Sequence, residues 1–129
     1  MAILVDTSVL ADAERGGSTL ERVASDEHMI SVISVSEFIH GIHRAVDSAR
    51  CARRQAFVEQ VLVELEALPI TIEVARVHAS IWAQLEAAGE VIGMHDLWIA
   101  ATALTHGLRV ATTNAREFER VPGLSVLAL

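Results

Sequence analysis

The stretch AILVDTS, residues 2–8, decides the fold class of this chain, because an unbroken apolar run ends on a carboxylate and two hydroxyls. The first four residues have the length and composition of a short buried strand. Strands that are apolar on both faces are typical of parallel sheets with helices on either side. Asp6, Thr7 and Ser8 then follow at the carboxyl end of the strand. Asp6 is therefore either the cap of a following helix or a ligand at the edge of a sheet.

Further along the chain, short apolar segments alternate with amphipathic ones. Strands are expected at residues 28–32, 67–70, 108–113 and 124–129. Helices are expected at residues 8–15, 34–45, 48–66, 72–88 and 95–106, with a further helical turn that begins at Ser18, where Ser18 and Glu21 have the spacing of a capping box. Gly89 and Gly107 lie just past two of these helices, where glycine commonly ends a helix. The alternation predicts a single three-layer α/β/α domain over residues 1–129, with a central, mainly parallel sheet of four to five short strands.

Composition narrows the classes of function. With 52% apolar residues in 129, the chain is long and apolar enough to fold around a core. Cys51 has no partner for an internal disulfide, and no apolar run approaches the roughly 20 residues of a membrane span, so a cytoplasmic protein is expected. The net charge of −7 argues against a general nucleic-acid binder. All ten basic residues are arginine, which binds phosphate and carboxylate bidentately, although genome composition explains the same bias.

Four acids stand apart from those on solvated helix faces, because each follows an apolar segment or opens a helix. They are Asp6, Glu37, Asp96 and Glu117. Each also has a purely structural interpretation. The first could cap the helix near Ser8, and the third lies in a first helical turn, where the helix dipole favours negative charge. The second and fourth stand three residues after Ser34 and Asn114, the spacing of a capping box.

Capping does not explain why all four acids should meet. In a parallel sheet, the carboxyl ends of the strands and the starts of the following helices share one edge. A cluster of carboxylates there repels itself unless cations are bound. Mg²⁺ and Mn²⁺ suit carboxylate and water ligands. Thr7, Ser8, Thr113 and Asn114 supply hydroxyls and an amide that could orient such ligands.

Four segments of the chain, taken in order, carry a family resemblance. VDTSVL (5–10), SVSEF (34–38), IGMHDLWIAATA (92–103) and ATTNAREFERVPGL (111–124) resemble the PIN-domain ribonucleases, and most closely the VapC toxins of bacterial toxin–antitoxin pairs. The resemblance covers essentially the whole chain. It implies a PIN-like fold and an endoribonuclease that depends on Mg²⁺ or Mn²⁺ and hydrolyses RNA phosphodiester bonds. It also implies inhibition by a cognate VapB-type antitoxin and a homodimer.

The resemblance assigns roles to the acids by position. Asp6, Glu37 and Asp96 match the first three acids of the family, and Glu117 or Asn114 fills the fourth position. We expect all four acids to be catalytic, with Asp6 and Asp96 as the direct metal ligands. Supporting groups are expected at Thr7, Ser8, Thr113 and Asn114. A phosphate track for RNA is expected at Arg44, Arg50, Arg53 and Arg54, unless these arginines pair with Asp47 or Glu59.

Other interpretations remain open at this point. The chain could be a catalytically inactive PIN-like binding module, or another acidic-site α/β phosphohydrolase. An aspartate-nucleophile phosphatase favours D-x-D at the first strand, whereas Ser8 occupies the second of those positions here. His40 and His43 have helical spacing that could serve zinc, but the single cysteine and the lack of HExxH count against it. Trp82 and Trp98 either stack on bases or pack in the core or a dimer contact.

Overall fold

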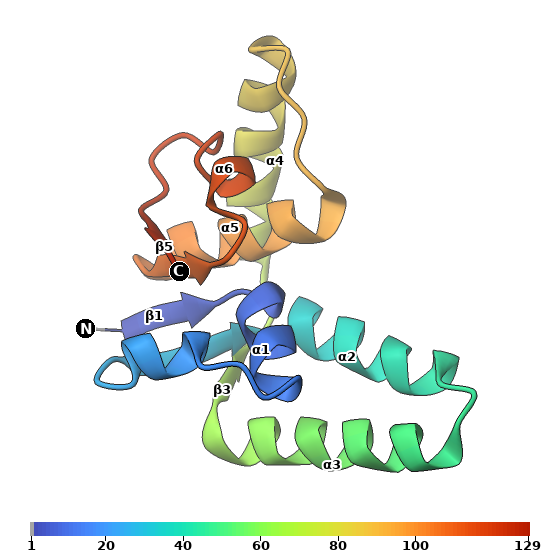
Figure 1. The fold of residues 1–129 in the computed structure, drawn as a ribbon. Coiled ribbons are helices and arrows are strands. Elements are labelled where there is room, and N and C mark those ends of the chain that lie inside the picture. The colour runs from blue at the N-terminus through green and yellow to red at the C-terminus, as the bar shows by residue number, and fades with distance from the viewer. Residues whose placement is uncertain (1) are drawn as a thin grey trace.

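The computed structural model describes residues 2–129 as a five-stranded sheet covered by helices on both faces (Figure 1). All strand pairs are parallel, and the strand order is β3-β2-β1-β4-β5. The strands are β1 (Ala2–Val5), β2 (Glu27–Ser31), β3 (Glu66–Leu68), β4 (Arg109–Thr112) and β5 (Val126–Ala128). β1 is the central strand, and Ile3 pairs with His28 on one side and with Arg109 on the other. The expected α/β/α architecture is confirmed.

The helices form two layers around this sheet. They are α1 (Thr7–Glu14), the 3₁₀ turn η1 (Thr19–Val23), α2 (Val32–Arg44), α3 (Ser48–Glu64), α4 (Ile72–Ala87), α5 (Met94–His106) and α6 (Ala115–Phe118). Figure 1 shows α1, α2 and α3 on one face and α4 and α5 on the other. Alternate side chains of β1 feed the two cores: Ile3 and Val5 pack with α1 to α3, and Leu4 packs with α4 and α5. This is why the first strand is apolar without interruption.

Local chemistry sets the helix ends, and here two expectations were wrong. Ser31, not Ser34, caps α2 by accepting a hydrogen bond from the Ile33 N–H at 3.0 Å. The helix therefore begins earlier than expected, and the capping-box interpretation of Glu37 is wrong. Ser18 makes no side-chain cap either, and the Thr19 N–H instead donates to Asp12. α6 was not expected as an element, because it is a single short turn after β4.

The fold brings distant segments to the carboxyl edge of the sheet. β1, β2 and β4 all end on this edge, because the strands are parallel and adjacent. α1 and α2 begin there, directly after β1 and β2, and α6 begins just after β4. Across the described residues, the longest apolar helical stretches fall short of what is needed to span a bilayer.

Candidate acidic site

The four singled-out acids come together at this edge from four different helices or helix starts. Asp6 precedes α1, Glu37 lies in α2, Asp96 lies in the first turn of α5, and Glu117 lies in α6. Burial raises the pKa of Asp96 from 3.8 to about 7, and the negative charges of Asp6, Glu117 and Glu37 add to this rise. Each of the other three acids therefore acts electrostatically on Asp96, as the parallel topology predicted.

Asp6 is the most buried member, with 3% of its surface exposed. Its Oδ2 atom accepts hydrogen bonds from the Ser8 hydroxyl at 2.7 Å and the Thr112 hydroxyl at 2.8 Å. The Ser8 N–H also donates to Oδ2, at 3.4 Å, so Asp6 does cap α1. No hydrogen bond among the described residues falls on Oδ1. One oxygen thus anchors the carboxylate, and the other stays free to accept a ligand.

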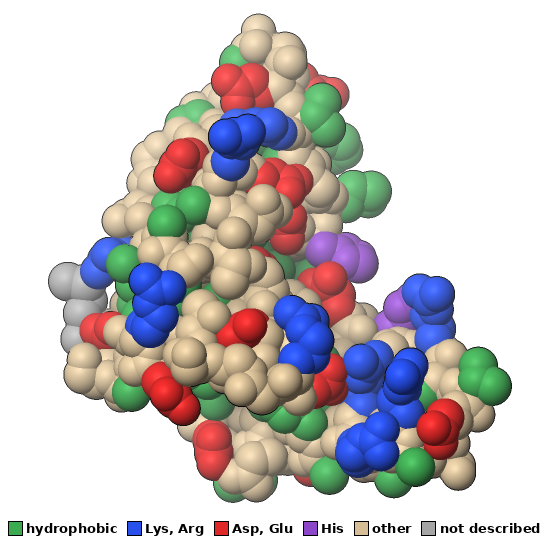
Figure 2. All heavy atoms as spheres, viewed as in Figure 1, with side chains coloured by type: hydrophobic (Ala, Val, Ile, Leu, Met, Phe, Trp, Pro, Cys, Tyr) green, Lys and Arg blue, Asp and Glu red, His purple; other side chains and the backbone are tan. Residues whose placement is uncertain are grey.

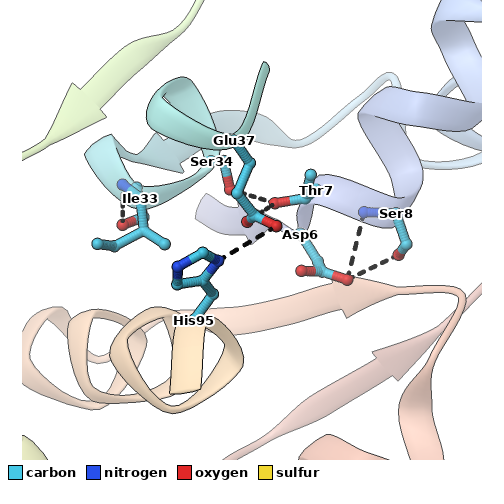
Figure 3. A network of polar contacts seen from close by, with 8 residues as sticks. Asp6, Thr7, Ser8, Ile33, Ser34, Glu37 and His95 are labelled. Atoms are coloured by element: carbon cyan, nitrogen blue, oxygen red, sulfur yellow. Dashed lines mark hydrogen bonds and ion pairs between the residues drawn. The ribbon is translucent and has the colours of Figure 1, made fainter. Parts of the chain in front are cut away.

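Glu37 is held by a chain of side chains that links α1, α2 and α5 (Figure 3). The Thr7 hydroxyl donates to Glu37 Oε1 at 2.8 Å and lies 2.7 Å from the Ser34 hydroxyl. Because Thr7 has a single hydroxyl proton, Ser34 must be the donor in the second contact. Glu37 Oε2 lies 3.6 Å from His95 Nδ1, and the His95 ring reaches across from α5 toward α2. These contacts, rather than a helix cap, fix the position of Glu37.

Glu117 is oriented from the other side of the site. Its Oε1 accepts the Gly93 N–H at 2.5 Å, and its Oε2 accepts the Asn114 amide at 2.7 Å. These hydrogen bonds, the Gly93 bond above all, lower the pKa of Glu117 and keep it ionised. Asn114 precedes α6 but makes no side-chain bond to the helix backbone, so the capping-box interpretation of Asn114 and Glu117 is wrong as well. Asn114 and Glu117 therefore form one unit at the fourth position, and protonated Asp96 donates to this unit through a hydrogen bond with Glu117.

The donor set fits a hard divalent cation. Burial is the main cause of the raised pKa of Asp96, and repulsion from the neighbouring carboxylates adds to it; a cation placed between these carboxylates would relieve that repulsion. Within residues 2–129, no three Asp, Glu, His or Cys side chains are arranged to ligate a single ion together. Carboxylate oxygens together with water are ligands that hard divalent cations commonly take, and the donors present here are of that kind.

Sequence reasoning missed several residues at the site. Thr112, Ser34 and His95 were not among the predicted site residues, although Thr112 donates to Asp6, His95 lies beside Glu37, and Ser34 hydrogen-bonds Thr7. Thr113 contributes its backbone N–H to the Ser8 hydroxyl, whereas the hydroxyl that reaches Asp6 is that of its neighbour Thr112. The alternation of side chains along β4 could have indicated Thr112, because a buried residue at a strand end faces the following helix start.

The arginines of the predicted phosphate track lie near one another in the structure. Arg50 and Arg54 line two neighbouring hollows at the α2–α3 end of the molecule, and Arg44 lines one of them and Arg53 the other. The expected alternative partners, Asp47 and Glu59, do not pair with Arg54. Its guanidinium instead binds Glu14 on α1 through two hydrogen bonds of 3.1 Å. Asp47 caps α3.

The two tryptophans differ in their surroundings. Trp98 packs against the core and stacks on His78, with ring centroids 3.5 Å apart, so core packing is confirmed for this residue. Burial lowers the pKa of His78, which keeps its ring neutral in this stack. Trp82 is 52% exposed and lines an apolar hollow of about 390 Å³ with Met94.

An open parallel α/β sheet with acids from four elements at its carboxyl edge defines a class of α/β protein whose ligand site is expected at that edge. The chain belongs to the PIN-domain family, whose model matches residues 3–124, and the predicted resemblance is thereby confirmed. Ribonuclease VapC of Rickettsia bellii is 36% identical over 130 residues, which cover 100% of this chain and 97% of that protein.

Two further relatives from Salmonella typhimurium support the same grouping. The tRNA(fMet)-specific endonuclease VapC is 36% identical over 97 residues, which cover 75% of this chain and 71% of that protein. The crystal structure of DNA-bound VapBC aligns with a TM-score of 0.89 and 30% identity over 99% of this chain and 98% of that one.

Proposed function

We propose that this chain is a metal-dependent endoribonuclease that hydrolyses RNA phosphodiester bonds and acts as the toxin of a toxin–antitoxin pair. One observation carries the proposal. Burial together with the charges of three neighbouring acids raises the pKa of Asp96 to about 7, in a chain that is 36% identical over its full length to a ribonuclease VapC. A site that only capped helices would not need this self-repelling arrangement.

Asp6 and Asp96 are the proposed direct ligands of Mg²⁺ or Mn²⁺. A bound divalent ion would supply a water of lowered pKa and would neutralise charge that develops on the phosphate. Asp6 has its Oδ1 free for this purpose, while Ser8 and Thr112 fix Oδ2. Asn114 and Glu117 close the far side of the site, where a second ion or its waters would be held.

Glu37 is the proposed residue that orients the attacking water. Its Oε1 is held by Thr7, and Thr7 is in turn held by Ser34, so the carboxylate cannot swing freely away from the site. A carboxylate preorganised in this way can accept a proton from water while that water approaches phosphorus. Asp6 and Asp96 lie across from it on the sheet edge, so the scissile phosphate would occupy the space that these three acids surround.

The experiment that tests this function is incubation of the purified chain with total RNA in Mg²⁺, in EDTA, and with Asp96→Asn in place of the wild type. We expect discrete RNA fragments only from the wild type with Mg²⁺. Transfer RNA is the first fraction to examine, because one relative is named as a tRNA(fMet)-specific endonuclease. Intact RNA under every condition would favour the inactive binding module. Release of phosphate from p-nitrophenyl phosphate without RNA cleavage would favour another phosphohydrolase.

A VapB-type antitoxin is the proposed inhibitor. Both proteins are proposed to act in the cytoplasm. The VapBC structure that this chain resembles is such a pair.

A homodimer is proposed as well, through the apolar hollow of α4 and α5. Trp82, Val91 and Met94 expose 52%, 76% and 80% of their surfaces there, and a second copy would cover them. Light scattering of Trp82→Glu beside the wild type tests this: a dimeric variant would refute the contact.

A further inference from the structure

Two helix faces place arginines opposite each other at the α2–α3 turn. On α2, Glu37, Gly41 and Arg44 have i, i+4, i+7 spacing and therefore share one side of the helix. On α3, Arg50 and Arg54 are four residues apart and also share a side. These five residues line a single hollow of about 340 Å³ between the two helices. Figure 2 shows arginine side chains gathered over this end of the molecule.

Arg54 lines this hollow and is held in place by an ion pair. Its Nε and Nη2 atoms donate to the two oxygens of Glu14, each at 3.1 Å, and its side chain is 33% exposed. A Cβ atom at position 41 would come within 2.6 Å of Arg54 Nη1, so Gly41 leaves the space that the guanidinium occupies. The charge of Arg54 is compensated by Glu14, and its position is fixed by contacts with α1 and α2.

Arg44 and Arg50, in contrast, carry charge that is available to a ligand. Both are exposed, and within residues 2–129 neither lies within ion-pair distance of a carboxylate. Arginine in such a setting binds a phosphate through two parallel N–H donors. The ring of His40 lines the same hollow and adds a further hydrogen-bonding group.

Glu37 belongs both to this hollow and to the acidic site. Glu37 lines the hollow and is also held by Thr7 at the carboxyl edge of the sheet. Arg44 lies seven residues further along α2, which is a rise of about 10 Å. An RNA strand whose scissile phosphate lies among the acids would therefore carry its neighbouring phosphates over the α2–α3 hollow.

We propose that this hollow is an RNA-backbone subsite in which Arg44 and Arg50 bind a phosphate on the Glu37 side of the scissile bond. This inference rests on the ribonuclease function proposed above and adds a path for the substrate. An acidic segment of the antitoxin is the competing occupant. The hollow favours RNA, because it has no large apolar side chain to anchor a peptide, whereas helices that dock in grooves depend on apolar anchors.

The test compares Arg44→Gln and Arg50→Gln with a matched control, Arg76→Gln. Arg76 is an exposed arginine on α4, on the opposite face of the sheet and outside both arginine hollows. Three measurements are made on each variant: the kcat and KM for cleavage of a short RNA with Mg²⁺, binding of the same RNA by fluorescence anisotropy in EDTA at several salt concentrations, and inhibition of cleavage by the purified cognate antitoxin. Melting temperatures confirm that each variant is folded.

We expect each hollow variant to raise KM roughly threefold to tenfold with kcat little changed, which is the effect of removing one charged hydrogen bond to the substrate. The slope of log affinity against log salt should fall by about 0.7 for each phosphate that the variant no longer neutralises. Arg76→Gln should change neither quantity. KM values and salt slopes that match the wild type in both hollow variants would overturn the subsite.

The remaining outcomes also decide the matter. If Arg44→Gln and Arg50→Gln weaken inhibition by the antitoxin while RNA binding is unchanged, the occupant is the acidic peptide and the RNA subsite is overturned. If the wild type itself neither binds nor cleaves RNA, the proposed function fails and this inference fails with it. Wild-type cleavage combined with unaffected hollow variants overturns the subsite alone, so the two failures are distinguishable.

Discussion

Replacing Asp96 with Asn should stabilise the metal-free protein while removing its activity. In the folded protein burial and three neighbouring acids raise the pKa of Asp96 from 3.8 to about 7. The folded state therefore holds a proton that the unfolded chain releases near pH 4. Between about pH 4 and pH 7 the folded state binds more protons than the unfolded chain, so the free energy of unfolding falls as the pH rises. Above pH 7 the full loss of stability is present. Asn carries no charge and can donate to Glu117, as protonated Asp96 does.

The size of the effect follows from the same shift. At about 1.4 kcal/mol per pH unit, the full rise in pKa would correspond to an upper limit of about 4 kcal/mol. Asp96 is only partly buried, and solvent and salt screen the neighbouring charges, so we expect about 1–2 kcal/mol. For a chain of this length that is a rise in melting temperature of about 4–8 °C at pH 8. At pH 4 the wild type and Asp96→Asn should have the same melting temperature.

The assay is thermal unfolding monitored by circular dichroism in EDTA, from pH 4 to pH 8. Glu59→Gln, which removes one exposed acid on α3, is the matched control and should follow the wild-type curve. Mg²⁺ should raise the melting temperature of the wild type at pH 8 more than that of Asp96→Asn. Parallel curves for the wild type and Asp96→Asn across the whole pH range would refute the acid-repulsion argument. Wild-type cleavage by purified Asp96→Asn would refute the proposed role in metal binding.

Three further predictions concern the groups around Asp96. Glu37→Gln should abolish most RNA cleavage and change the melting temperature little, because Ser31 rather than Glu37 caps α2; an active variant would show that the Thr7–Glu37 pair is only structural. Thr112→Val should cost about 1–2 kcal/mol in urea unfolding and weaken Mg²⁺ binding by calorimetry, because Asp6 loses a buried hydroxyl donor; unchanged Mg²⁺ affinity would contradict the anchoring role. A basic residue near the C-terminus of the antitoxin should compete with Mg²⁺ for these carboxylates, so changing it to Ala should weaken inhibition; inhibition that is unaffected at every Mg²⁺ concentration would indicate steric occlusion.

Most of the fold could be predicted from the chain alone, because each element carries its own signal. The apolar run of β1 and the glycine after α5 mark their elements without help from distant residues, and Gly107 does adopt the left-handed conformation, with φ of 65°. The start of α2 was misplaced, because Ser31 and Ser34 are equally good caps in sequence and only the end of β2 decides between them. The α6 turn was missed because four residues are too few to show a helical period.

The sequence by itself determined which residues could meet, because parallel strands with helical connections bring strand ends and helix starts to one edge. Asp6, Glu37, Asp96 and Glu117 follow from that rule. Only the tertiary structure decided how they are held: Thr112 on Asp6, Thr7 on Glu37, and Gly93 on Glu117. Those partners lie between 24 and 106 residues apart in the chain. A hydrogen bond depends on distances of about 3 Å and on direction, and the spacing of residues along a sequence contains neither.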